Sequence, residues 1–187
     1  MKKLKNILVL SIAISAFASF TCNAQNKYLD KNGTIVFEAS EKLFEEVKAQ
    51  TQSATAILNI DTHEIASLAL VKGFRFKNSL MEEHFNENYI ESDTYPKAVF
   101  KGKLVAFDST ALTETPSDIV VEGTLELHGK TKDVRTTLSV HKIEDTIAME
   151  GSFKVAAADF NIEIPKIVRN KIAKEVLVQI DFNLTKK

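Results

Sequence analysis

The chain has 187 residues, with 24 Lys and Arg against 25 Asp and Glu and a formal net charge of -1 at pH 7. This length allows one domain with a substantial core and is short for two. An evenly mixed, near-neutral charge is atypical of nucleic-acid-binding domains, which carry strongly basic surfaces. No nucleic-acid partner is therefore expected.

The first 24 residues have the organisation of an export signal. Lys2, Lys3 and Lys5 precede an apolar run over residues 7–20, and small residues follow up to Ala24. We expect a signal peptide cleaved after Ala24, leaving residues 25–187 as a periplasmic or secreted domain. Its formal charge would be -4, because the leader contains three lysines and no acid. The run is shorter than the roughly 20 residues that span a bilayer, so no stable membrane insertion is expected.

Cys22 is the only cysteine of the chain. It would be the acylated residue of a lipoprotein, but the preceding Ser-Phe-Thr lacks the Leu and small residues that lipoprotein processing favours, so lipidation is the less favoured alternative. Cleavage after Ala24 removes this cysteine. The mature chain would then have no disulfide, no thiolate nucleophile and no cysteine metal ligand.

Apolar and polar residues alternate over most of the chain from Thr34 onward, which predicts strands with one buried and one wet face, as in antiparallel sheets. The strands are predicted at residues 34–40, 53–61, 64–71 with a continuation at 73–77, 97–107, 121–128, 134–140, 147–155 and 176–184. The sequences HGKT (128–131) and EDT (144–146) are short enough to join neighbouring strands as hairpins.

Two segments have helical rather than alternating spacing. In residues 78–88, Leu80, Met81 and Phe85 can share one helical face, with Asn78 or Ser79 as the N-cap. Residues 164–175 repeat apolar side chains in a similar way, and Pro165 suits a first helical turn. We therefore expect one or two short helices.

About eight meandering antiparallel strands can form two stacked sheets or close into a barrel. Closure removes both sheet edges, and an eight-stranded barrel is just wide enough to be packed solid or to hold one small ligand. Periodicity alone does not choose between these interiors.

Three segments, in this order, resemble the YceI-like family: HFNENYIESDTYPKAVFKGKL (84–104), VEGTLELHGKTKDV (121–134) and GSFKVAAADFNIEIP (151–165). The resemblance implies an all-β fold, an eight-stranded antiparallel lipocalin-like barrel with one or two short helices at its mouth. It also implies a non-enzymatic binding protein that holds a long-chain lipid, such as a polyisoprenoid or a fatty-acid derivative. Residues 66–85 depart from the best-known members, which leaves the identity of the ligand open.

On this basis the predicted helix is a lid over the mouth, with His84 placed to contact a headgroup, and Phe100 and Leu104 point into the lumen. The candidate ligand-binding residues are Phe74, Phe76, Leu80, Met81, His84, Phe85, Phe100, Leu104, Leu125, Leu127, Met149, Phe153, Phe160 and Phe182. Without the resemblance, the same residues fit a filled core. Four basic residues flank the lid elements and are either headgroup contacts or ordinary surface charge: Arg75, Lys77, Arg169 and Lys171.

The four histidines lie on separate predicted elements with no i, i+4 pair, so no metal or other cofactor is expected. His128 and His141 fall on the polar phase of their strands and are expected to be exposed. Glu82, Glu83, Glu87, Glu91 and Asp93 are expected to form a solvated face, and no catalytic motif is present.

Three functions follow from these observations. The leading interpretation is an exported carrier of an amphiphilic lipid. The second is an envelope stress-related interaction protein with a filled core, and the third is a lipid-modifying enzyme that uses His84 and Glu83. Whether two barrels pair as a homodimer stays open.

Overall fold

The computed structural model describes residues 26–41 and 44–187. The expected signal peptide, its cleavage site after Ala24 and the alternative lipidation of Cys22 fall outside these residues. Within the described ranges, no helix has the length and apolar character needed to cross a membrane.

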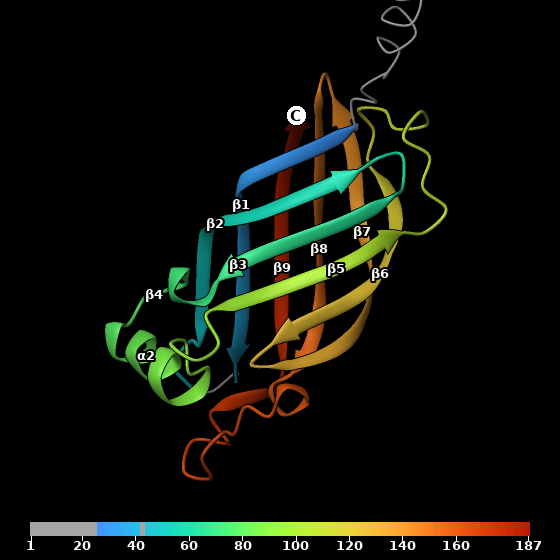
Figure 1. Ribbon diagram of the computed structural model, residues 1–187. Coiled ribbons are helices and arrows are strands. Elements are labelled where there is room, and N and C mark those ends of the chain that lie inside the picture. The colour runs from blue at the N-terminus through green and yellow to red at the C-terminus, as the bar shows by residue number, and fades with distance from the viewer. Residues whose placement is uncertain (1–25, 42–43) are drawn as a thin grey trace, which may run out of the picture.

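The described residues form one antiparallel sheet that closes on itself (Figure 1). Its strands are β1 (Lys27–Ser40), β2 (Lys48–Asn59), β3 (Glu64–Leu70), β4 (Arg75–Phe76), β5 (Lys97–Leu104), β6 (Ser117–Leu127), β7 (Lys130–Ile143), β8 (Thr146–Ala156) and β9 (Ile172–Lys186). Apart from the two-residue β4, which pairs with β2, the strands follow one another around the sheet in chain order. β1 pairs with both β2 and β9 and closes an eight-stranded barrel, so the predicted fold class is confirmed.

The hairpin turns explain the tight connections between strands. His128 and Gly129, which join β6 to β7, have φ values of 49° and 68°. Two consecutive residues with positive φ form the two-residue turn whose twist matches that of the flanking strands. An added Cβ on Gly129 would also lie 2.8 Å from the ring of Tyr95, so this position requires glycine on two grounds.

The first predicted helix is present as α2 (Ser79–His84), which continues into a π-helical turn at Phe85–Tyr89. Asn78 caps it, because its side-chain oxygen accepts hydrogen bonds from the backbone N–H groups of Leu80 and Met81 at 2.9 and 3.4 Å. Two 3₁₀ turns, Val71–Gly73 and Ala157–Phe160, complete the helical elements of the described residues.

The second predicted helix, over residues 164–175, is wrong. Residues 166–171 form turns, and β9 begins at Ile172. Ile172 pairs with Ser40 of β1, and Glu175 pairs with Ala156 of β8. At residues 172–175, hydrogen bonding to strands on both sides therefore outweighs the helical spacing of the apolar residues.

The two ends of the barrel differ. One end carries the β7–β8 hairpin and the loop at residues 105–116, and its interior is filled by buried apolar side chains: Tyr28, Leu58, Leu104, Phe107, Val140, Ile147, Met149 and Leu184. In this loop the hydroxyl and the backbone N–H of Thr110 donate to Asp108 and lower the pKa of its carboxyl group. The other end carries α2, the β6–β7 hairpin and residues 157–171 (Figure 1).

Candidate functional site

The barrel contains a cavity of about 550 Å³ that reaches from its interior to the end where α2 lies. This size falls within the range of small-molecule sites. Alternate, inward-facing residues line it on several strands, among them Ile35, Phe37 and Ala39 on β1, Ile65, Ser67 and Ala69 on β3, and Val176, Val178 and Ile180 on β9. Over this part of the barrel the inward-facing side chains leave space between the walls, in contrast to the filled opposite end.

Most of the candidate residues named from the sequence line this cavity. They are Phe74, Phe76, Leu80, Met81, His84, Phe85, Phe100, Leu125, Leu127, Phe153, Phe160 and Phe182. Leu104 and Met149 do not line it, because they are buried in the filled end of the barrel. Both side chains point into the barrel, as the alternation predicts, but they pack in its buried apolar core. Contact of any of these residues with a ligand stays a prediction.

Several lining residues were absent from the predicted set. Those on β1, β3 and β9 share the alternation already recognised on other strands, so the sequence contained the signal for them. Lining residues from the loop before β9 had no such signal, because their spacing indicated a helix. These loop residues are Ile162, Ile164, Val168 and Lys171.

Aromatic rings seat the lid on the barrel wall. The ring centroid of Phe37 on β1 lies 5.3 Å from that of Phe74, 5.7 Å from that of Phe76 and 5.3 Å from that of Phe85. Phe76 and Phe85 are themselves 5.2 Å apart. Tilted and edge-on pairs at such distances stabilise beyond their area burial. All four side chains also line the cavity, so the lid contact and the cavity wall are one surface.

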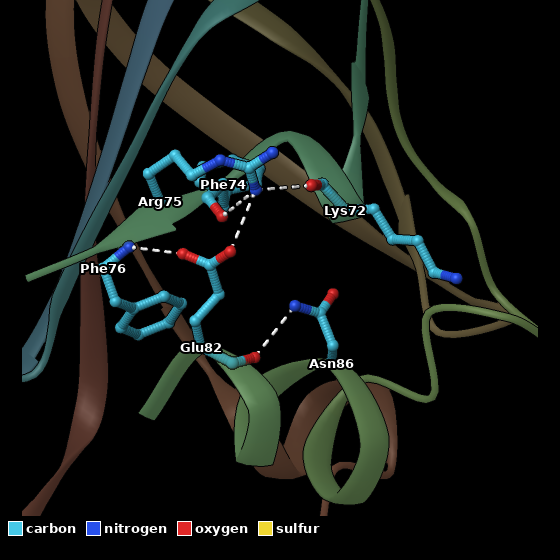
Figure 2. Close-up of polar contacts among 6 residues, drawn as sticks. All are labelled: Lys72, Phe74, Arg75, Phe76, Glu82 and Asn86. Atoms are coloured by element: carbon cyan, nitrogen blue, oxygen red, sulfur yellow. Dashed lines mark hydrogen bonds and ion pairs between the residues drawn. The ribbon is translucent and has the colours of Figure 1, made fainter. Parts of the chain in front are cut away.

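Glu82 fastens α2 to the segment of β4 (Figure 2). One of its carboxylate oxygens accepts from Arg75 Nη1 at 3.0 Å, and the other accepts from the backbone N–H of Phe76 at 3.1 Å. Arg75 Nη1 also donates to the backbone oxygens of Lys72 and Phe74, and Asn86 Nδ2 donates to the backbone oxygen of Glu82. Glu82 was expected on a solvated face, and the structure corrects this, because its carboxylate joins two elements.

His128 holds the segment that follows the helical residues 79–89. Its side chain is only 10 % exposed, with Nδ1 2.9 Å from the backbone oxygen of Phe160 and Nε2 2.9 Å from Glu91 Oε2. Tyr95 packs on the ring with centroids 4.4 Å apart. Both polar partners are acceptors, so a neutral imidazole donates to one of them at a time and the imidazolium to both.

The expected exposure of His128 is therefore wrong. The residue lies in the hairpin turn rather than on a polar strand face, and its ring points into the junction of three segments. His141 is half-buried on β7, which also departs from the expectation.

Few polar side chains face the cavity. Within the barrel they are Ser67 and Thr136, and the Thr136 hydroxyl donates to the backbone oxygen of Ser152 at 2.7 Å. The remaining polar lining side chains lie on the lid and the loops at the mouth: Glu45, Asn78, His84, Tyr89 and Lys171. The site thus combines an apolar interior with an opening that carries polar as well as apolar side chains, which suits an amphiphilic molecule.

Of the four basic residues considered as headgroup contacts, Lys171 alone is among the described residues that line the cavity. Arg75 is engaged by Glu82. Within residues 26–41 and 44–187, no three His, Cys, Asp or Glu side chains are grouped as a metal site would require. Glu83 and His84, the starting residues for a catalytic hypothesis, are both exposed, and no hydrogen bond joins them in the described structure.

A closed eight-stranded barrel with this lid and cavity agrees with the family resemblance seen in the sequence, and the domain pattern of the YceI-like domain matches residues 20–184. The chain belongs to the YceI-like family. No curated protein matches this sequence.

Solved structures share the fold of this YceI-like chain at low sequence identity. A polyisoprenoid binding domain from Saccharophagus degradans superposes with a TM-score of 0.76 at 17 % identity, over 87 % of this chain and 99 % of that one. BcnA of Burkholderia cenocepacia gives 0.67 at 16 % identity, over 82 % and 96 % of the two chains. The YceI protein of Campylobacter jejuni gives 0.63 at 14 % identity, over 79 % and 89 %. At these identities the likeness shows the fold.

Proposed function

We propose that this YceI-like protein is exported and carries a long-chain amphiphilic lipid, a polyisoprenoid or a fatty-acid derivative, with the apolar tail inside the barrel. The observation that supports this most directly is the cavity of about 550 Å³ with its almost entirely apolar strand walls. The structural likeness to a domain described as polyisoprenoid binding gives independent support. Export is supported by the leader-like residues 1–24.

The energetics favour such a ligand. Burial of an apolar chain contributes about 0.8 kcal/mol per CH₂, so ten methylenes contribute ~8 kcal/mol before ordering costs are subtracted. Ordering costs bring the net binding free energy below this gross value, and each further methylene raises it again by about 0.8 kcal/mol. An apolar lumen therefore supplies useful binding without a polar contact, and the polar groups at the mouth add the preference for one headgroup over another.

The test is to purify the mature protein, residues 25–187, extract it with organic solvent and analyse the extract by mass spectrometry. We expect a co-purified long-chain lipid and uptake of fluorescent long-chain or prenyl probes. Ala98→Trp places an indole into the cavity and should block uptake, whereas Val99→Trp is the matched control, since Ala98 lines the cavity and Val99 does not. A clean extract without probe uptake, or equal uptake by both variants, would overturn the proposal.

A further inference from the structure

Apolar side chains from three separate segments are exposed around the mouth of the cavity. Phe44 is 44 % exposed, Leu80 on α2 is 55 % exposed and Ile167 in the loop before β9 is 84 % exposed. Phe44 and Leu80 also line the cavity, and Ile167 lies between the lining residues Ile164 and Val168. We call Phe44, Leu80 and Ile167 the mouth rim. Phe44 and Leu80 are thus part of the cavity wall, and Ile167 belongs to a segment that contributes to that wall.

The charge next to the mouth rim is uneven. Residues 164–171 contain Lys166, Arg169 and Lys171 and no acidic residue, and all three basic side chains are exposed. Acidic side chains flank the other rim residues, with Glu45 and Glu46 beside Phe44 and Glu83 on α2. The most exposed apolar residue, Ile167, therefore lies within the basic segment.

We infer that the mouth rim docks on an anionic bilayer, with residues 164–171 approaching first and Ile167 entering the interface. An apolar residue flanked by basic ones is the arrangement by which soluble proteins bind anionic membranes peripherally. The acidic side of the mouth is repelled by the same surface, so the barrel docks tilted toward the basic segment. The inference rests on the proposed function for its purpose, because a carrier must take up its lipid from a membrane.

Docking at the mouth solves a physical problem of lipid uptake. A long apolar chain that leaves a bilayer through water exposes each methylene on the way, and this exposure slows its transfer. With the mouth rim in the interface, the chain enters the cavity beside Phe44 and Leu80, which are rim and cavity wall at once. The filled end of the barrel offers no such route, because its interior is packed.

Vesicle co-sedimentation of the mature protein tests the inference. We expect binding to phosphatidylcholine vesicles that contain phosphatidylglycerol, weaker binding to pure phosphatidylcholine, and release by high salt. Ile167→Asp and the double variant Lys166→Glu/Arg169→Glu should each lower the partition coefficient by about tenfold or more. The matched controls at the opposite end are Ile143→Asp, a 50 % exposed apolar residue in β7, and the double variant Lys186→Glu/Lys187→Glu, neither of which should change binding.

The outcomes separate docking from ligand binding. If Ile167→Asp binds vesicles as the wild type does, or if pure phosphatidylcholine binds equally well, docking of this kind is refuted. A dimer in solution that Ile167→Asp dissociates would also refute it, because a second copy would then cover the mouth rim. Probe uptake in solution, measured on the same variants, should be unchanged. If the wild type takes up no probe, the carrier role is overturned, but the conclusion about vesicle binding is unaffected.

Discussion

The two faces of β5 give the sharpest test of the cavity. Phe100 lines the cavity and is half-buried, whereas the next residue, Lys101, is exposed on the outer face. The ring of Phe100 lies over two paired glycines, since its Cζ would be 2.8 Å from a Cβ added to Gly102 and 2.7 Å from one added to Gly123. Phe100→Asp and Lys101→Asp therefore place the same carboxylate on opposite sides of one strand.

The expected loss of affinity follows from two contributions. Removing the ring forfeits about 1 kcal/mol of apolar contact with the ligand, as for a side chain that is only partly covered. Covering an unpaired carboxylate with an apolar tail costs at least ~2 kcal/mol. Together these exceed about 3 kcal/mol, or more than a hundredfold in Kd. Lys101→Asp should change Kd by less than about threefold, because surface changes fall within roughly ±0.5 kcal/mol.

Displacement of a fluorescent long-chain probe measures both Kd values. Phe100→Asp also removes packing over the glycines, so thermal melts must show that the compared samples are folded, and Phe100→Leu provides a milder variant that keeps the cavity apolar. We expect Phe100→Leu to bind within about tenfold of the wild type. Equal effects of Phe100→Asp and Lys101→Asp on folded protein would show that this wall does not contact the ligand.

Three further predictions concern the fastening of the lid. His128→Ala removes the ring whose nitrogens contact the Phe160 backbone oxygen and Glu91, and it should cost about 2 kcal/mol, lowering Tm by about 4–8 °C, whereas the exposed His84→Ala should leave Tm unchanged. Gly129→Ala combines a φ of 68° with a clash against the ring of Tyr95 and should cost about 2 kcal/mol in urea unfolding. Glu82→Ala should speed amide hydrogen exchange over residues 75–89 while Glu83→Ala does not, because only Glu82 bonds to β4.

Each of these predictions has a contradicting result. If His128→Ala has the Tm of the wild type, water hydrogen-bonds the Phe160 backbone oxygen and the Glu91 carboxylate as well as the imidazole does. Unchanged urea unfolding of Gly129→Ala would show that the turn relaxes without strain. Equal exchange in the two glutamate variants would show that the aromatic contacts alone hold α2.

Much of the architecture follows from local chemistry that the sequence states directly. Alternation over two-residue steps assigns each strand residue to a face, so the inward set of β6 to β9 could be predicted. The turn at His128 and Gly129 and the Asn78 cap depend on residues only a few positions apart. These features can be predicted from the sequence because the interactions that produce them join residues only a few positions apart.

Tertiary structure alone decided how far the cavity extends and which segments lie around its mouth. Leu104 and Phe100 share one strand face, yet the first lies in the filled end and the second lines the cavity, because the free space depends on side chains from opposite walls that are distant in sequence. Residues 172–175 became part of a strand for a similar reason, since pairing with β1 and β8 outweighs local helical spacing. The burial of His128 likewise needs Glu91 and Phe160, which only the closed barrel brings to it.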